Sequence, residues 1–451
     1  MIVLDIFFIV LYSLIVSVIG NFILLDLSTI WLLLLIFAFM YINAIPKNPL
    51  SFLKIRSPKL RNTACGTSLL KIFLLSVTID SVIAILGMFG KLTEYGIPSF
   101  GDEKGTWIRT IIIIIVIENI VFWNGIIRIY LTASQLGFRF RLIGALCGMI
   151  PVVHLVVLGI MIYIADKEVR VENEKIILND SRADQKICAC KYPLLMVHGV
   201  FFRDFRYLNY WGRIPEQLMK NGATVFYGNQ QSAASVERCG QELAARIKEI
   251  CEQTGCGKVN VIAHSKGGLD TRMAIAKYGA GPYVASVTTI NTPHRGCEFA
   301  DYLLSKIGEK HQTRVAHMYE AALRKLGDPS PSFLEAVNDL TSTSCARLNE
   351  EMPDPEGIYC QSVGSKLNHA YSGRFPLNFS TFLVHHFDGP NDGLVGAKSF
   401  CWGKDYQFLI SKGRRGISHG DMIDLNRENF DGFDVREFFV QLVAGLKNKG
   451  F

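Results

Sequence analysis

The sequence predicts an all-α membrane bundle followed by an α/β domain with a mostly parallel sheet. Two observations lead to this fold class. Long apolar runs fill the chain before residue 165, and short apolar strands alternate with helical segments after residue 190. Such alternation favours a parallel sheet covered by helices on both faces. We expect a membrane region at residues 1–165, a polar linker at 166–190 and an α/β domain at 191–451.

Five apolar runs in the first part are each long enough to cross the hydrocarbon core of a bilayer. They cover residues 6–25, 29–45, 72–90, 110–127 and 142–164. So many runs exclude a signal peptide as the explanation. We therefore expect about five membrane-spanning helices in a multi-pass protein of the cell membrane.

Basic residues indicate how these helices are oriented. They collect between the second and third runs (Lys47, Lys54, Arg56, Lys59, Arg61, Lys71) and between the fourth and fifth (Arg128, Arg139, Arg141). Basic loops stay in the cytoplasm, so five spans place the α/β domain on the extracytoplasmic side. The eleven irregularly spaced cysteines favour the opposite side, because they indicate free thiols rather than a disulfide framework.

Three ionisable residues, Asp80, Glu118 and His154, lie inside the apolar runs. Such residues are costly in a bilayer and face a partner or a cavity. Two interpretations follow. The three side chains form a polar cluster that handles protons, ions or lipid head groups, or they pair with one another and only stabilise helix packing. We favour the second interpretation.

The segments of the α/β domain follow from apolar pattern and length. Apolar strand-like segments occur at 193–197, 223–227, 259–263, 284–290, 357–363 and 382–386, and helical segments at 211–221, 236–253 and 435–446. Amphipathic helical sequence interrupts the alternation at about 298–350. An insertion at this position predicts a helical lid over the site described next.

The segment Val259–Leu269 carries the strongest chemical signal. A buried strand leads into Ser265, and Gly267 with Gly268 opens a helix. A serine on a tight strand-to-helix turn presents its hydroxyl as a nucleophile. The N–H groups at the start of the helix favour the negative charge that develops during acyl transfer.

A serine nucleophile needs a histidine base and an acid that orients it. In this kind of site the acid follows the serine and the histidine comes last. Asp392 lies in a turn, and His419 is the only histidine after it. Asp388, four residues earlier, is the rival acid. The N–H groups of Lys266, next to the nucleophile, and of Val200, after the first strand, are the expected oxyanion-hole donors.

These motifs, at residues 192–199, 263–269, 291–296 and 391–395, resemble in order and spacing those of bacterial triacylglycerol lipases of the α/β-hydrolase superfamily. The resemblance covers about residues 192–440. It implies an α/β-hydrolase fold, the triad Ser265, Asp392 and His419, and the backbone donors Val200 and Lys266.

The resemblance also bears on cofactors. Many such lipases bind calcium through a carboxylate two residues after the catalytic histidine, and Asp421 occupies that position. A second carboxylate upstream of Asp392 is missing, because the chain there reads Asn-His-Ala-Tyr-Ser-Gly at 368–373. The triad itself requires no cofactor.

Together these features predict a membrane-anchored serine hydrolase that cleaves carboxylic esters, such as acylglycerols or other lipids, through an acyl-enzyme. One alternative is an acyltransferase that uses the same acyl-enzyme. Another is a transporter or sensor bundle that carries an inactive, hydrolase-like binding module. The net charge of +7 arises mostly in the membrane region and gives no reason to expect a nucleic-acid partner.

Overall fold

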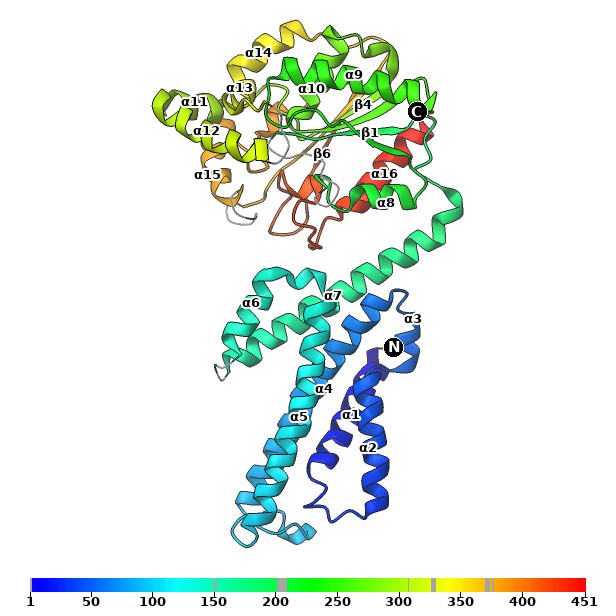
Figure 1. Ribbon diagram of the computed structural model, residues 1–451, viewed down its shortest axis with the longest axis vertical. Coiled ribbons are helices and arrows are strands. Elements are labelled where there is room, and N and C mark those ends of the chain that lie inside the picture. The colour runs from blue at the N-terminus through cyan, green and yellow to red at the C-terminus, as the bar shows by residue number, and fades with distance from the viewer. Residues whose placement is uncertain are drawn as a thin grey trace. The chain divides into compact units, whose positions relative to one another are not determined.

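The computed structural model describes residues 2–148, 150, 152–200, 209–306, 308–325, 330–369, 374 and 377–451. The chain forms two compact units, Met1–Asp180 and Ser181–Phe451 (Figure 1). This division places the boundary inside the segment that was expected to be a linker. Each unit is described by itself below.

The N-terminal unit contains four helical segments that are long and apolar enough to cross a membrane. They are α1 (Ile2–Gly20), α2 (Thr29–Ala44) with the short α3 (Pro49–Lys54), α4 (Pro58–Met88) and α5 (Lys104–Thr132). Many of their apolar side chains are exposed, as lipid-facing residues are. The four segments suggest a membrane protein.

The predicted fifth span at 142–164 is wrong as a single helix. Two helices, α6 (Gly137–Cys147) and α7 (Val153–Arg182), share this sequence. Pro151 stands between them, and proline interrupts helices because it has no N–H and its ring clashes with the preceding turn. The eleven residues of α6 are roughly 16 Å long, about half the thickness of the hydrocarbon core.

The expected linker at 166–190 also differs from the structure, because α7 continues through it to Arg182. The segment is rich in Glu, Lys and Arg, which are good helix formers even where nothing apolar holds them. Three of its charged side chains, Glu168, Lys175 and Arg182, are buried, so the polar composition of the segment was a poor guide to its conformation.

A polar seam joins α1 to α4. Three successive turns of α1 make hydrogen bonds to α4 at a constant sequence offset, Ser13 Oγ to Ile72 O (3.3 Å), Ser17 Oγ to Ser76 O (3.4 Å) and Asn21 Nδ2 to Asp80 Oδ1 (2.9 Å). The offset is constant because the two helices run parallel. Polar contacts of this kind hold membrane helices together where the hydrophobic effect cannot.

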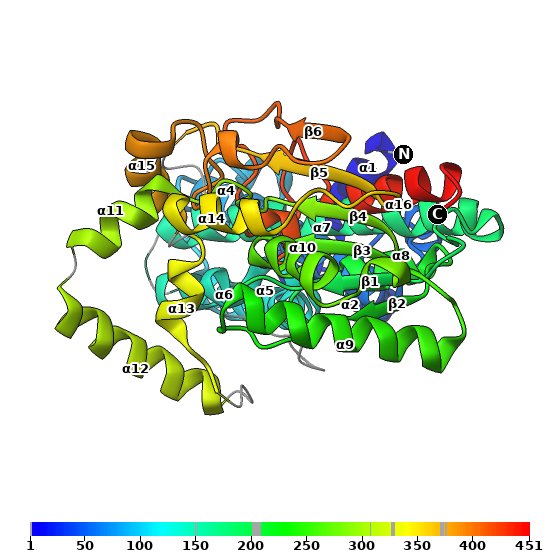
Figure 2. The same ribbon diagram turned by 90° about the horizontal axis from the view of Figure 1, so that it is seen from above.

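The C-terminal unit is built on a six-stranded sheet in the order β2-β1-β3-β4-β5-β6 (Figure 2). The strands are β1 (Leu194–Val197), β2 (Val225–Tyr227), β3 (Val259–His264), β4 (Val284–Ile290), β5 (Tyr359–Ser365) and β6 (Asp405–Leu409). Every neighbouring pair is parallel. The carboxyl ends of all strands therefore meet at one edge, where parallel sheets place their functional residues.

Helices cover both faces of the sheet. Side chains alternate along β1, so that Leu194 and Met196 pack against α8 (Ile214–Lys220) and α16 (Val435–Asn448). Leu195 and Val197 pack on the other face with α9 (Val236–Thr254), and α10 (Lys266–Lys277) lies beside α9. The structure thus has the predicted α/β arrangement with a parallel sheet.

Helices also follow β4, as predicted for residues 298–350. They are α11 (Glu298–Lys306), α12 (Glu309–Lys325), α13 (Phe333–Asn338) and α14 (Ser342–Glu351), and α11 to α13 lie together beyond one end of the sheet in Figure 2. The rings of Tyr302 on α11 and Phe387 on α15 (Leu377–Asp388) lie 4.6 Å apart. The insertion therefore packs on the segment that precedes Asp392.

Two elements of this unit differ from the sequence reading. The segment 382–386 is part of α15 rather than a strand, since a short apolar run such as Phe382–Val384 fits either structure. Strand β6 was not predicted, because it is a partly exposed edge strand with polar residues.

All eleven cysteines are free thiols, as expected from their spacing. Burial raises the pKa of Cys239, Cys345 and Cys360 to about 12, so these thiols stay protonated and unreactive near neutral pH.

Candidate active site

Ser265 occupies a strained turn between β3 and α10. Its backbone has φ 55° and ψ −131°, a region that residues other than glycine rarely adopt. Its N–H donates to Ile290 O on the neighbouring β4 at 2.9 Å, which ties the turn to the sheet. This is the geometry of a nucleophile elbow.

The chain after β1 lies directly against this turn. A Cβ atom placed on Gly199 would be 2.9 Å from Ser265 Cβ, so no side chain fits there. Gly267 faces the backbone of His198 at similarly close range. Glycines at both positions allow the loop that carries Val200 to approach the serine.

Asp392 and His419 form the central hydrogen bond of the site. His419 Nδ1 lies 2.6 Å from Asp392 Oδ2, and because a carboxylate can only accept, Nδ1 is the donor. The Nε2 atom of His419 is then unprotonated and able to accept a proton. The N–H of His419 also donates to Asp392 O at 2.9 Å, so that backbone and side chain are held together.

Other donors fix the Asp392 carboxylate, which is fully buried. Asn291 Nδ2 donates to Oδ2 at 2.6 Å, and the N–H groups of Leu394 and Val395 donate to Oδ1 at 2.9 Å each. These contacts fix the orientation of the Asp392 carboxylate toward His419.

The His419 ring lies beside the elbow, with its centroid 4.5 Å from that of His264, the residue before Ser265. A hydrogen bond of 2.6 Å joins His264 Nδ1 to the Tyr210 hydroxyl. Burial lowers the pKa of His264 well below its usual value, so it remains neutral and does not repel an imidazolium at His419. Within the described residues, the Ser265 hydroxyl makes no hydrogen bond to another side chain, and this includes the His419 imidazole.

The rival acid Asp388 has a different partner. As the last residue of α15, it accepts from the N–H groups of Glu298 (3.0 Å) and Phe299 (3.1 Å) at the start of α11. Asp388 therefore caps the first helix of the insertion, and its carboxylate is not bonded to His419.

The two expected oxyanion donors lie on either side of Ser265. Lys266 is the first residue of α10, and Val200 follows Gly199, which contacts the serine. Residues 201–208, which complete the loop after Val200, lie outside the described residues.

The side chain of Lys266 is almost completely buried. Its Nζ donates to Asp270 Oδ1 at 2.6 Å, one helical turn further along α10. Burial opposes the charge, but the adjacent carboxylate outweighs it and raises the pKa of Lys266. The i,i+4 spacing of these two residues is a signal that sequence analysis could have used.

Asn291 and Tyr210 were not assigned a role from sequence. Asn291 follows β4 with φ 47° and bridges Asp392 to the Ser365 hydroxyl at 2.8 Å. The sequence feature that could have identified Asn291 is its position directly after a buried strand, because asparagine tolerates a positive φ there. Nothing in the sequence pattern links Tyr210 to His264.

Asp421, the expected calcium ligand, pairs with an arginine. Arg415 Nη2 donates to Asp421 Oδ1 at 2.6 Å, and the N–H of Ser418 donates to Oδ2 at 2.9 Å. No group of three or more His, Cys, Asp or Glu side chains suited to a metal occurs within the described residues.

Among the described residues, the three ionisable residues of the apolar runs are not joined in one hydrogen-bonded cluster. Asp80 is bonded to Asn21, and Glu118 is buried on α5. The ring of His154 instead packs on Phe122, with centroids 5.6 Å apart, beside a cavity of about 410 Å³. Among the residues that the structure describes, no hydrogen bond or ion pair joins His154 to either carboxylate.

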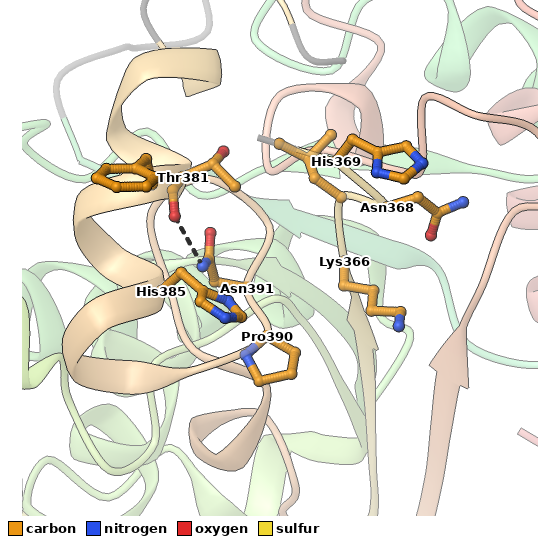
Figure 3. Close-up of a pocket in the computed structure, with 9 residues that line it drawn as sticks. Lys366, Asn368, His369, Thr381, His385, Pro390 and Asn391 are labelled. Carbon is orange, nitrogen blue, oxygen red and sulfur yellow. Dashed lines mark hydrogen bonds between the residues drawn. The ribbon is translucent and has the colours of Figure 1, made fainter. Parts of the chain in front are cut away.

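A pocket of about 310 Å³ lies beside the Asp392 loop (Figure 3). His369 and His385, which follow Ser265 in the sequence, line this pocket together with Lys366. Asn391, the neighbour of Asp392, donates to Thr381 O at 3.2 Å and so connects the loop to α15. Neither Ser265 nor His419 is among the residues that line this pocket.

The Lys266–Asp270 pair leads to a stability prediction. Asp270→Leu leaves a buried lysine without its partner and should lower the free energy of unfolding by about 3–5 kcal/mol. The Lys266→Met/Asp270→Leu double variant removes both charges and should recover most of that loss. Thermal unfolding of the purified chain in detergent measures both effects. If the double variant were less stable than Asp270→Leu alone, the pair would not be the reason for the loss.

Comparisons with known proteins agree with this geometry. Residues 192–388 match the alpha/beta hydrolase fold family. A triacylglycerol lipase of Pseudarthrobacter phenanthrenivorans is 42% identical over 177 residues, which are 37% of this chain and 55% of that protein. A triacylglycerol lipase of Burkholderia plantarii is likewise 42% identical over 177 residues, which are 37% of this chain and 49% of that protein.

The chain spans about half the length of these two relatives. Among solved structures, the Staphylococcus hyicus lipase is similar at 17% identity, with a TM-score of 0.45 over 57% of this chain and 96% of that one. The C-terminal unit therefore has the α/β-hydrolase fold, and its sequence is similar to those of triacylglycerol lipases.

Proposed function

We propose that the chain is a membrane-anchored serine hydrolase that cleaves carboxylic esters of lipids through an acyl-enzyme. The observation that carries the proposal is the buried Asp392–His419 hydrogen bond next to the strained turn at Ser265. The similarity to triacylglycerol lipases supports the same reaction.

In the proposed reaction, Ser265 Oγ attacks the ester carbonyl carbon while His419 Nε2 takes the hydroxyl proton. The N–H groups of Lys266 and Val200 stabilise the oxyanion. The carbon–oxygen bond to the alcohol then breaks, and the alcohol leaves with the proton from His419. Water, deprotonated by His419, attacks the acyl-enzyme and releases a carboxylic acid and the original serine.

Exposed apolar side chains on the insertion and on α15 favour a lipid as substrate. Met318 on α12 is 69% exposed and Phe382 on α15 is 68% exposed, and Leu303, Val315 and Leu383 add to this apolar surface. Exposed apolar patches of this kind mark contacts with lipid or protein. Together with four apolar helices in the same chain, they support an ester substrate that is drawn from a membrane.

The proposed nucleophile can be tested with a fluorophosphonate probe on membranes that contain the full chain. Ser265 should be labelled, and Ser265→Ala should lose the label, because the probe reacts only with an activated serine. Asp80→Asn and Glu118→Gln, which lie in the other unit, are the controls and should keep it. An unlabelled wild-type chain that is folded would instead favour a binding module over an enzyme.

We further propose that the hydrolase unit faces the cytoplasm. The number of spans decides this, because both basic segments should lie on the cytoplasmic side. Helices α4 and α5 cross the membrane between them, and no described helix after α5 is long and apolar enough to cross again. The extracytoplasmic side followed from a fifth span that the structure divides into two helices. Eleven free thiols also suit a reducing compartment.

Cys401 provides a test of this orientation, because it is an exposed cysteine on the hydrolase unit. A membrane-impermeant maleimide added to the outside of intact cells should leave Cys401 unlabelled, and permeabilisation should expose it. Cys401→Ser identifies the labelled site. Labelling of Cys401 before permeabilisation would place the unit outside.

A further inference from the structure

The loop that follows the candidate base is held by a network of arginines and carboxylates. Asp421 is buried, and its two oxygens already accept from Arg415 Nη2 and Ser418 N–H. A calcium ion at Asp421 would have to displace the guanidinium. The residues present therefore do not fit the calcium site that the resemblance implies.

The network extends beyond Asp421. Arg415 Nη1 donates to Glu428 Oε2 at 3.3 Å, and Arg374 Nε donates to the same oxygen at 2.9 Å. The Arg415 guanidinium also lies over the Phe430 ring, 4.3 Å from its centroid. The carboxylates of Asp421 and Glu428 and the ring of Phe430 thus surround the Arg415 guanidinium. Each of these contacts stabilises the positive charge of an arginine.

Asn368 begins the segment in which the upstream carboxylate is missing, and its contacts lie within the described residues. Asn368 Nδ2 donates to Ser411 O at 3.0 Å and to Gly413 O at 2.6 Å, and its N–H approaches Arg415 O at 3.4 Å. This amide binds the backbone of the segment that carries Arg415. It holds the loop by donating hydrogen bonds, where a carboxylate would have needed a cation.

The contacts reach His419 through its direct neighbour. Ser418 donates its N–H to Asp421 Oδ2, and its hydroxyl accepts the N–H of Asp421 at 3.2 Å. The N–H of Ile417 donates to Lys366 O at 2.8 Å at the end of β5. Any movement of Asp421 therefore displaces the backbone from which the imidazole projects.

We propose that Arg415 takes the place of a calcium ion in this protein, and that it is a positioning residue for His419. A guanidinium supplies permanent charge and directed hydrogen bonds, so it neutralises Asp421 and fixes the loop without any metal. The effect on catalysis rests on the proposed esterase function. The proposal that Asp421 needs no calcium ion does not depend on the esterase function.

The first test concerns calcium and needs no activity. Thermal unfolding of the full chain in detergent is measured in EDTA and in millimolar calcium. A folded-state metal site would raise the midpoint in calcium by mass action. The expected result is the same midpoint in both solutions, and a midpoint that rises with calcium in the wild-type chain but not in Asp421→Asn would overturn the proposal.

The second test separates positioning from stability. Arg415→Met should lower kcat for a soluble short-chain ester by about tenfold to a hundredfold, since small displacements of a catalytic group have effects of that size. KM should change little, because Arg415 acts on His419 through Asp421 and Ser418. Arg415→Lys should recover part of kcat, since it restores the charge but not the bidentate geometry. Assays are run well below the unfolding midpoint of each variant.

Arg246→Met is the matched control, because Arg246 makes an ion pair of the same length, 2.6 Å, with Glu249 on α9. It should keep kcat within about twofold, as exposed pairs contribute little. An Arg415→Met variant with the wild-type kcat would overturn the positioning role. If wild type and variants alike are inactive and the fluorophosphonate probe does not label Ser265, the esterase function has failed and the calcium result still stands.

Discussion

The hydrogen bond between Asp392 and His419 is the interaction on which the site depends. It joins two loops that leave the sheet far apart in sequence, and it can form only because each loop is fixed independently. Asn291 and two backbone N–H groups hold the carboxylate, and Arg415 holds the segment that carries the imidazole through Asp421. The strained turn at Ser265 then needs only to present its hydroxyl to a base that is already in place.

Sequence analysis identified the parts of this site whose local geometry requires particular residues. The turn at Ser265 needs small neighbours and a buried strand before it, and Asp392 was recognisable from its position in a turn after which only one histidine remained. Arg415 was not recognised, because nothing in its local sequence distinguishes it from any exposed arginine. Its role depends on Glu428 and Phe430, which reach it only in the folded chain.

The errors in the predicted fold also arise where local sequence does not determine the structure. Hydropathy counts apolar residues but does not show whether they form one helix, so a run interrupted by Pro151 was taken as one span. The segment 382–386 was assigned to a strand for the same reason. By contrast, the alternation of strands and helices in the C-terminal unit was correctly identified, because β1, β3 and β4 are short buried segments rich in apolar residues that lie between helical segments. The expected side of the membrane depends on the same count of spans.

Three buried charges in this unit are paired with an oppositely charged side chain. Lys266 has Asp270, Asp421 has Arg415, and Asp424 accepts from Arg213 Nε at 2.7 Å. The central claim is that Ser265, His419 and Asp392 act as one catalytic group. Its most direct test is peptide mass spectrometry after rapid acid quenching of the full chain with a short-chain p-nitrophenyl ester. The account predicts an acyl group on Ser265 in the wild type and none in His419→Ala. Hydrolysis of the ester without any acyl group on Ser265, or with the acyl group on another residue, would contradict it.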